Sequence, residues 1–233
     1  MMNFSVENRF SFAVQFTAEI NCSEDDATSK KLGLAVKWAL KNDANLEGAN
    51  LIAAYLAGAY LRGVGLTGAN LKGANLEGAN LEGACFGGAN LKGANLAGAN
   101  LRGANLAGAY FAGANLRGAY FEGANLEGAN LAGAYLAGAD LAGASLGVAN
   151  LGGANGMNDW VKCIQIETYA IAYTAEILQI GCESHPIADW RNFDNRRIAE
   201  MDGKTALKFW DKYRDWIFQT IELCPAKPTG AKQ

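Results

Sequence analysis

Residues 69–108 read ANLKGANLEGANLEGACFGGANLKGANLAGANLRGANLAG, and this five-residue pattern decides the fold. The pattern begins at Ala44 and continues to residue 155 without an insertion or a deletion. Its central residue recurs at every fifth position from Leu46 to Leu151, which defines 22 units. The central residue is leucine in 19 units and phenylalanine in the other three, Phe86, Phe111 and Phe121. An internal repeat of this regularity predicts a solenoid.

A period of five fits neither an amphipathic helix nor a single strand, which repeat every 3.6 and every 2 residues. Helix is also disfavoured because a glycine in nearly every unit would cost about 1 kcal/mol each time relative to alanine. Collagen requires glycine at every third position. The pattern therefore predicts a short extended segment and then a turn in each unit, with glycine at the turn position that needs positive φ. Alanine and leucine, two residues apart, are predicted to point into the coil.

The Ala-Asn-Leu-x-Gly units resemble the signature of the pentapeptide-repeat proteins, Ala-(Asp/Asn)-Leu-x-x, over residues 44–155. This resemblance implies a mainly β protein, a right-handed quadrilateral β-helix in which four units form one coil. The 22 units, at four per coil, would then make about 5.5 coils. The predicted organisation is an N-terminal strand and capping helix (1–43), the β-helix (44–155) and a small C-terminal α+β domain (156–233).

Residues twenty apart stack in such a coil, so four outer faces can be read from the sequence. One face carries an alternating ladder of Arg62, Glu82, Arg102 and Glu122, which we interpret as a solvated surface. Tyrosine replaces the usual outward asparagine at several positions, and it suits either a contact surface or simple strand filling. The candidate partner-contact residues are Tyr55, Tyr60, Lys72, Lys92, Tyr110, Tyr120 and Tyr135.

The N-terminal segment alternates apolar and polar residues over 3–20, which predicts one long strand or a hairpin turning near Asn8. A helix follows at about 29–41, and we expect it to cover the open apolar end of the coil. The alternation predicts that one apolar face gathers Phe4, Val6, Phe10, Phe12, Val14, Phe16, Ala18 and Ile20.

The C-terminal segment predicts two or three strands within 161–181, a short helix near Pro186, and helices at about 195–202 and 205–224. Residues 169–177 echo residues 12–20, so the two segments either converged as apolar strands or share a pairing role, within one chain or between two. The apolar N-terminal face and this echo predict a homodimer. The candidate dimer strands contain Phe10, Phe12, Phe16, Tyr169, Ile171 and Tyr173.

No catalytic residues, cofactor site or metal site are predicted. Cys182 and His185, the only histidine, form half of a metal motif at most, with Cys163 and Cys224 as the nearest other thiols. The five scattered cysteines predict a reducing compartment, and a cytoplasmic location in a bacterium or a phage-infected host is expected. The N-terminus lacks the apolar run of a signal peptide, and no stretch is long enough to span a membrane.

The net charge of −3, with 20 basic and 23 acidic residues, predicts no direct binding of nucleic acid. We predict a non-enzymatic module that binds a protein partner through the outer faces of the coil. The resemblance adds a sharper hypothesis, because some pentapeptide-repeat proteins mimic duplex DNA and occupy the DNA site of type II topoisomerases. A phage-encoded inhibitor of a DNA-handling host protein is one reading, although the balanced coil charge departs from that pattern. The alternative is a structural or scaffold protein of a phage or prophage.

Overall fold

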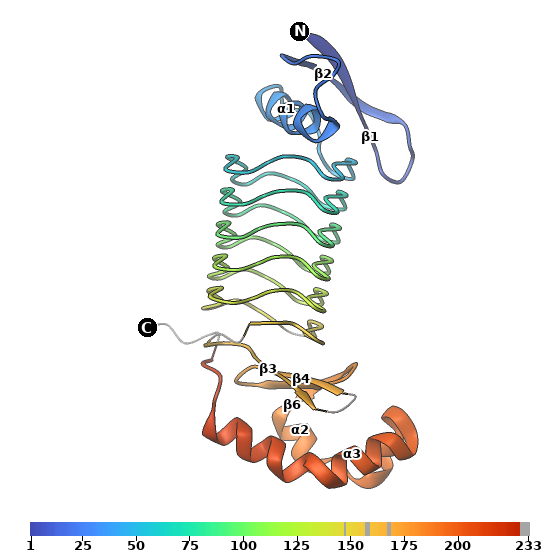
Figure 1. The fold of residues 1–233 in the computed structure, drawn as a ribbon, viewed down its shortest axis with the longest axis vertical. Helices are drawn as coiled ribbons and strands as arrows, with labels where there is room; N and C mark the ends of the chain where they lie inside the picture. The colour runs from blue at the N-terminus through green and yellow to red at the C-terminus, as the bar shows by residue number, and fades with distance from the viewer. Residues whose placement is uncertain (147, 157–158, 167–168, 229–233) are drawn as a thin grey trace.

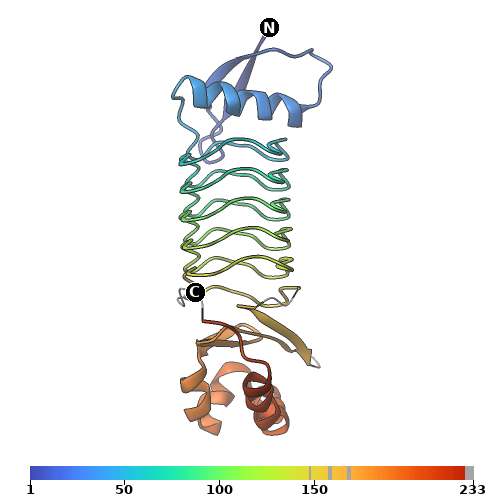
Figure 2. The same ribbon diagram turned by 90° about the vertical axis from the view of Figure 1, so that its left-hand side faces the viewer.

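The computed structural model describes residues 1–228 apart from 147, 157–158 and 167–168. The molecule is a rod with three parts along its long axis (Figures 1 and 2). A β-hairpin and a helix lie at the N-terminal end, stacked coils fill the middle, and a small sheet with two helices lies at the other end. Within the described residues, no helix is both long enough and apolar enough to cross a membrane.

The coils stack through hydrogen bonds between residues about twenty apart. Parallel bridges join Asn70 to Asn90 and so on along the axis, always with a spacing of twenty, so four repeats complete one coil. The Leu71 amide donates to the Asn90 carbonyl of the next coil at 2.7 Å, and the Gly73 amide donates to the Lys92 carbonyl at 3.0 Å. The Asn90 amide donates back to the Ala69 carbonyl at 2.9 Å. Each repeat therefore bonds to both of its neighbours along the rod.

Each corner of a coil is the predicted tight turn. The Ala74 amide donates to the Leu71 carbonyl at 2.9 Å, and Gly73 between them has φ of 65°. In a type II turn only the third residue has positive φ, and this position favours glycine. Two corners lack glycine: Ala53 and Val148 occupy them with φ of 57° and 48°. The coil geometry is thus imposed even where the residue does not suit it.

The coil interior is filled by the predicted alanine and leucine side chains, all of them buried except Ala44 of the first repeat, which is partly buried. The three larger centres, Phe86, Phe111 and Phe121, are also fully buried. On the outside of the coil, most asparagine side chains accept a hydrogen bond from the backbone amide two residues later. The Asn70 Oδ1 accepts from the Lys72 amide, and the pattern repeats along the coil. Asparagine side chains bond between coils at Asn90 to Asn70 and Asn115 to Asn95.

The N-terminal segment is a hairpin, and the prediction of one continuous apolar face is wrong. Strands β1 (Met2–Glu7) and β2 (Val14–Ile20) pair antiparallel, and the chain turns through residues 8–13. Val6, Ala18 and Ile20 are buried as predicted. Phe10 and Phe12 lie in the turn, however, and are 64% and 77% exposed. Alternation continues through the turn in the sequence, so it could not show where the strand ends.

Helix α1 (Thr28–Lys41) lies across the first coil, with Leu32, Ala35 and Val36 in the same hydrophobic core as the coil leucines. Its contact is close at Gly33, where a β-carbon would lie 2.1 Å from the Tyr55 carbonyl oxygen. The helix also covers the hairpin, because Phe16 of β2 stacks on Trp38 with ring centroids 6.2 Å apart.

The C-terminal segment forms a four-stranded antiparallel sheet. Three of its strands lie within 161–181, in agreement with the two or three predicted there, and the fourth lies just beyond that range. The strand order is β3 (Lys162–Ile166), β4 (Tyr169–Tyr173), β5 (Ile177–Ile180) and β6 (Glu183–Pro186). Helix α2 (Ile187–Asn192) and helix α3 (Asn195–Leu223) follow. Helix α3 is kinked at Asp202 and Gly203, where the backbone is not helical. The kink lies where the sequence predicts the end of one helix and the start of the next.

Two glutamines satisfy backbone groups at the ends of the coil stack. At the first coil, the Gln15 side-chain amide donates to the carbonyls of Asn45 and Glu47 at 2.8 and 2.9 Å. At the last coil, the buried Gln179 Oε1 accepts from the Leu151 amide at 2.7 Å. The first coil thus receives a donor and the last coil receives an acceptor, each of them complementary to the groups left unpaired there.

Candidate partner-binding face

The seven candidate contact residues lie on three different faces of the coil. The bridges place Tyr55 and Tyr135 in one column of stacked residues, and Tyr60 and Tyr120 in a second. Tyr110 belongs to a third column, with Asn90 above it and Asn130 below. Lys72 and Lys92 each follow an asparagine of this third column by two residues, so they share its face. The lysine face, as we name it, consists of Lys72, Lys92 and Tyr110.

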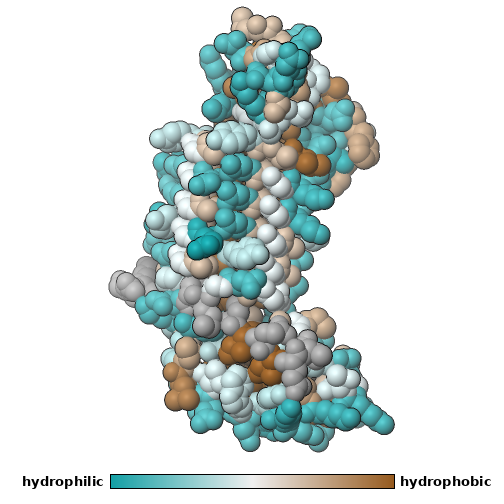
Figure 3. All heavy atoms as spheres, in the orientation of Figure 1, coloured by the Kyte–Doolittle hydropathy of each residue, from teal (hydrophilic) through white to brown (hydrophobic). Residues whose placement is uncertain are grey.

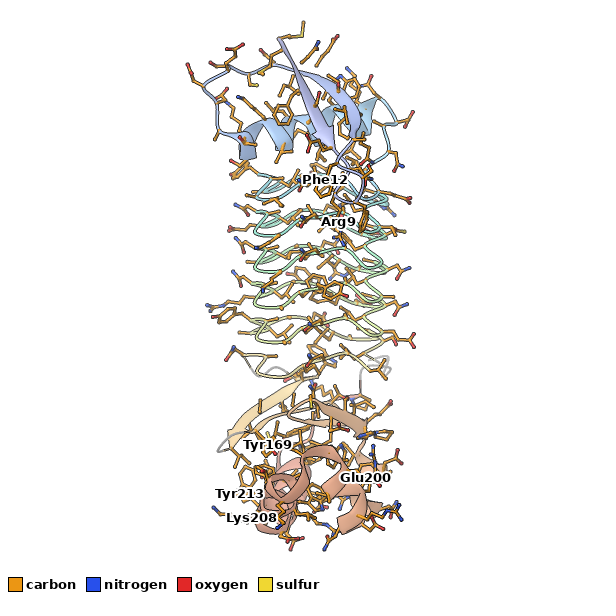
Figure 4. All side chains as sticks on the ribbon, turned by 90° about the vertical axis from the view of Figure 1, so that its right-hand side faces the viewer. Arg9, Phe12, Tyr169, Glu200, Lys208 and Tyr213 are labelled. Carbon is orange, nitrogen blue, oxygen red and sulfur yellow. The ribbon has the colours of Figure 1, made fainter. Side chains whose placement is uncertain are left out.

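A hollow of about 430 Å³ lies on the lysine face, and the N-terminal hairpin contributes to it. Lys92 and Tyr110 line it together with small or amide side chains of the neighbouring coils. Arg9, from the turn of the hairpin, completes the rim. Arg9 lies beside the upper coils in Figure 4. The hollow is lined by Arg9, Asn90, Lys92, Tyr110, Ala112 and Asn130.

The hairpin turn is fixed to the coil by backbone bonds. Asn8 forms an antiparallel bridge with Ala49, and the Arg9 amide donates to the Gly48 carbonyl at 2.7 Å. The Arg9 guanidinium donates to the Ala69 carbonyl at 3.2 Å and lies 4.4 Å from the Phe10 ring centroid. Sequence reasoning missed Arg9, and the only signal was the expectation of a turn near Asn8.

The cations of the lysine face, and Arg9 beside it, have no acidic partner among the described residues. Within the part of the chain that the structure describes, Arg9, Lys72 and Lys92 form no ion pair. The charge ladder on another face behaves differently, because Arg62 pairs with Glu82 at 3.1 Å and Arg102 with Glu122 at 3.2 Å. Opposite charges on that ladder balance one another, whereas the lysine face presents uncompensated positive charge beside an exposed tyrosine.

The candidate dimer strands are not brought together. Phe16 lies in β2, while Tyr169, Ile171 and Tyr173 lie in β4 at the opposite end of the rod, in a separate sheet. Pairing of the two echoing segments within one chain is therefore wrong. Strand β4 pairs with β3 on one side and with β5 on the other, so it has no open edge for a second chain. Phe10 and Phe12 lie outside any strand, as described above.

Among the described residues, Cys182 and His185 gather no further metal ligand, and the side chain of Cys163 lies outside what the structure describes. His185 Nε2 lies 3.1 Å from Glu183 Oε2, and its ring packs edge-on against Trp190 and Phe193. Among the described residues, no group of three or more metal-ligating side chains comes together. The pKa of Tyr169 is raised to about 12 by burial and by its bond to the Asp202 carboxylate.

The family model for pentapeptide repeats matches residues 44–83, 84–123 and 119–155. The chain is a pentapeptide-repeat protein. Membership of this family implies a right-handed β-helix, and the parallel bridges of spacing twenty agree with that architecture. A search of the curated proteins gave no match.

Several solved pentapeptide-repeat structures are similar to part of this pentapeptide-repeat protein. QnrB1, a plasmid-mediated fluoroquinolone resistance protein, is 26% identical over 48% of this chain and 57% of its own, with a TM-score of 0.44. A protein from the cyanobacterium Cyanothece is 40% identical over 40% of this chain and 60% of its own, with a TM-score of 0.29. A Nostoc protein is 38% identical over 35% and 69%, with a TM-score of 0.24. This chain therefore spans 57% and 60% of the first two structures.

Proposed function

We propose that this protein is a non-enzymatic binding module whose lysine face contacts an acidic surface of a protein partner. The observation that carries the proposal is the uncompensated positive charge of Arg9, Lys72 and Lys92 beside exposed Tyr110. Tyrosine and arginine are enriched in the buried cores of interfaces, and complementary charge selects the partner. Lys72 and Lys92 lie on adjacent coils, about 4.8 Å apart along the axis, which suits a partner with carboxylates on one rigid element.

The test is site-specific photo-crosslinking. A benzoylphenylalanine at position 110 is expected to crosslink one protein from nuclease-treated cell extract, and Lys72→Glu with Lys92→Glu is expected to abolish that product. The same crosslinker at Tyr60, on another face, is the matched control, and Arg117→Glu is the control for charge. Equal crosslinking from both positions, or a product that survives the double charge reversal, would contradict the proposal.

Mimicry of duplex DNA would need a different face. The coil between 44 and 155 carries five basic residues and six acidic ones, so its overall negative field is weak. The acidic residues are Glu47, Glu77, Glu82, Glu122, Glu127 and Asp140. Competition distinguishes the two ideas, because duplex DNA would displace a mimic from its partner, whereas polyglutamate would displace the partner from the lysine face.

We also propose the division into 1–43, 44–155 and 156–233, with a quadrilateral coil of about 5.5 turns between two end segments. The proposed homodimer would form through the exposed apolar side chains of the hairpin, not through strand pairing. Phe10, Phe12 and Val14 are all exposed there, and apolar surface is visible on the hairpin in Figure 3.

Light scattering at micromolar concentration tests this self-association. Twice the chain mass is expected for the wild type, and the chain mass is expected for Phe12→Ser. Tyr60→Ser, an exposed aromatic residue on the coil, is the control. A monomeric wild type would exclude the dimer and leave the proposal for the lysine face standing.

A further inference from the structure

A second cavity lies far from the lysine face, in the C-terminal segment. Its volume is about 330 Å³, within the range of small-molecule sites. Strands β4 and β5 form one side, and helices α2 and α3 form the other. Tyr169, on this side of the sheet, lies between the strands and α3 in Figure 4. The walls are largely aromatic, from Tyr169, Trp190, Phe209 and Trp210.

The kink in α3 shapes the cavity. Asp202 and Gly203 interrupt the helix, and Gly203 has φ of 56°. Residues on both sides of the kink line the cavity, Ile198 before it and Ala206 after it. The Tyr169 hydroxyl donates to the Asp202 carboxylate at 2.5 Å, which ties the kink to β4. The cavity is therefore held open by a turn and a hydrogen bond between two of its walls.

The aromatic walls leave one polar group without a partner. Trp190 and Trp210 pack together with ring centroids 5.3 Å apart, and both are buried. The Trp190 indole N–H donates to the Leu178 carbonyl at 2.6 Å. The Trp210 indole N–H is buried and has no hydrogen-bond acceptor among the described residues. A buried donor without an acceptor is costly, and a ligand that supplies one removes that cost.

The charges at the cavity select against an anion. Asp202 and Glu183 both line it; Glu183 lies 3.1 Å from His185 Nε2 and 4.0 Å from the Arg197 guanidinium, whereas Asp202 has no basic neighbour among the described residues. A ligand carboxylate or phosphate would face these two acidic groups. A neutral group with an exposed oxygen or nitrogen acceptor meets no such repulsion. The lining is otherwise apolar, so the body of the ligand must be apolar too.

From these features we propose that the cavity binds a neutral, flat, apolar molecule, and that the Trp210 ring turns on binding so that its buried indole N–H donates to the hydrogen-bond acceptor of the ligand. The aromatic walls suit a ring system, because flat rings stack on or meet the edges of aromatic side chains. This site is independent of the lysine face. It gives the C-terminal segment a role as a small-molecule receptor, in addition to its position against the last coil.

The probe that tests the proposal is Prodan, a neutral naphthalene with a ketone acceptor and environment-sensitive fluorescence. Saturable binding with a blue shift is expected for the full chain. Trp210→Phe removes the donor and keeps the ring, and it is expected to weaken Prodan binding about tenfold. Trp216→Phe, at a tryptophan that is 44% exposed on the same helix, is the matched control.

A second probe isolates the hydrogen bond. 2-Dimethylaminonaphthalene lacks the ketone, so its affinity is expected to be the same in the wild type and in Trp210→Phe. Equal losses for both probes would show that the variant merely disturbs packing and would overturn the assignment to the indole N–H. Ala206→Phe, which fills the cavity, is expected to abolish binding of both.

Protection of Cys182 locates the probe without any substitution. Cys182 lines the cavity and is exposed to reagents, whereas exposed Cys85 lies on the coil. Prodan is expected to slow alkylation of Cys182 at least fivefold, read by peptide mass spectrometry, and to leave Cys85 unchanged. Absence of saturable binding, or equal alkylation of Cys182 with and without Prodan, would overturn the proposal.

Discussion

Val148 stands at a coil corner where glycine is the rule. Its φ of 48° is unfavourable for a β-branched side chain, and the side chain is 71% exposed, so it gains little from packing. Val148→Gly is expected to stabilise the protein by about 1 kcal/mol, because relief of backbone strain outweighs the added freedom of glycine in the unfolded chain. Chemical denaturation measures the change.

The reverse substitution at an ordinary corner is the control. Gly103 has φ of 61°, and a β-carbon there would meet no atom within 4 Å. Gly103→Ala is thus expected to destabilise by about 1 kcal/mol through the backbone alone. A loss of stability in Val148→Gly would show that the strain at residue 148 is overestimated.

Leu101 tests the register of the repeat, since its side chain is fully buried on the coil axis. Leu101→Asp is expected to cost several kcal/mol and to abolish cooperative unfolding, because the carboxylate has no partner there. Asn105→Asp is the control: Asp140 already holds the equivalent outward position and accepts from the Ala142 amide. Circular dichroism melting curves compare the two, and an unchanged curve for Leu101→Asp would contradict the register.

Through Tyr169, the stability of the C-terminal segment depends on pH. Burial and the Asp202 carboxylate raise its pKa from 10.0 to about 12, so the folded state favours the neutral phenol. This contribution to stability is fully present below pH 10 and is lost as the pH rises from 10 to about 12. The wild type minus Tyr169→Phe difference in absorbance at 295 nm is expected to titrate near that upper value. A difference that titrates near 10 would exclude the raised pKa.

At the scale of elements, α1 depends on its closest approach to the coil. The Tyr55 amide donates to the Ser29 carbonyl at 2.9 Å, and Gly33 lies against the Tyr55 carbonyl. Gly33→Ala is expected to destabilise by about 1–3 kcal/mol despite the higher helix propensity of alanine, because the methyl group forces the helix away. Thermal unfolding measures this, with exposed Lys37→Ala as control. Stabilisation by Gly33→Ala would mean that the higher helix propensity of alanine outweighs the steric clash with the Tyr55 carbonyl.

The coil and its corners could be predicted from sequence because nearly every repeat carries the same residue types at the same positions. The ends of the strands could not be predicted, because the apolar–polar alternation continues through Phe10 and Phe12 in the turn and looks the same as in a strand. Hairpin boundaries depend instead on tertiary bonds, such as the bridge from Asn8 to Ala49. The rim residue Arg9 and the cavity at Trp210 were missed for the same reason: each joins segments far apart in the chain.

At the scale of the whole molecule, the core divides into two clusters. One runs from the hairpin through the coil to Val161 and Ala172, and the other lies between the sheet and helices α2 and α3. Gln179 connects them by bonding Leu151 and Asn150 of the last repeats. Gln179→Leu is expected to leave these groups unsatisfied, so that the C-terminal segment unfolds earlier than the coil.

Differential scanning calorimetry measures this separation as two transitions in the variant. Gln219→Leu, at an exposed glutamine of α3, is the control and should unfold like the wild type. A single unchanged transition in Gln179→Leu would show that apolar contacts alone hold the two clusters together.

The direction of the bonds between coils has an electrical consequence. In each repeat the leucine and glycine amides point toward the C-terminal end and the asparagine amide points back, as at Leu71, Gly73 and Asn90. One peptide dipole of about 3.5 D per repeat is thus left uncancelled along the axis. The rod is therefore a permanent electric dipole with its positive pole toward the C-terminal sheet. It should align in an applied field, and a charged partner would approach its two ends with different energies.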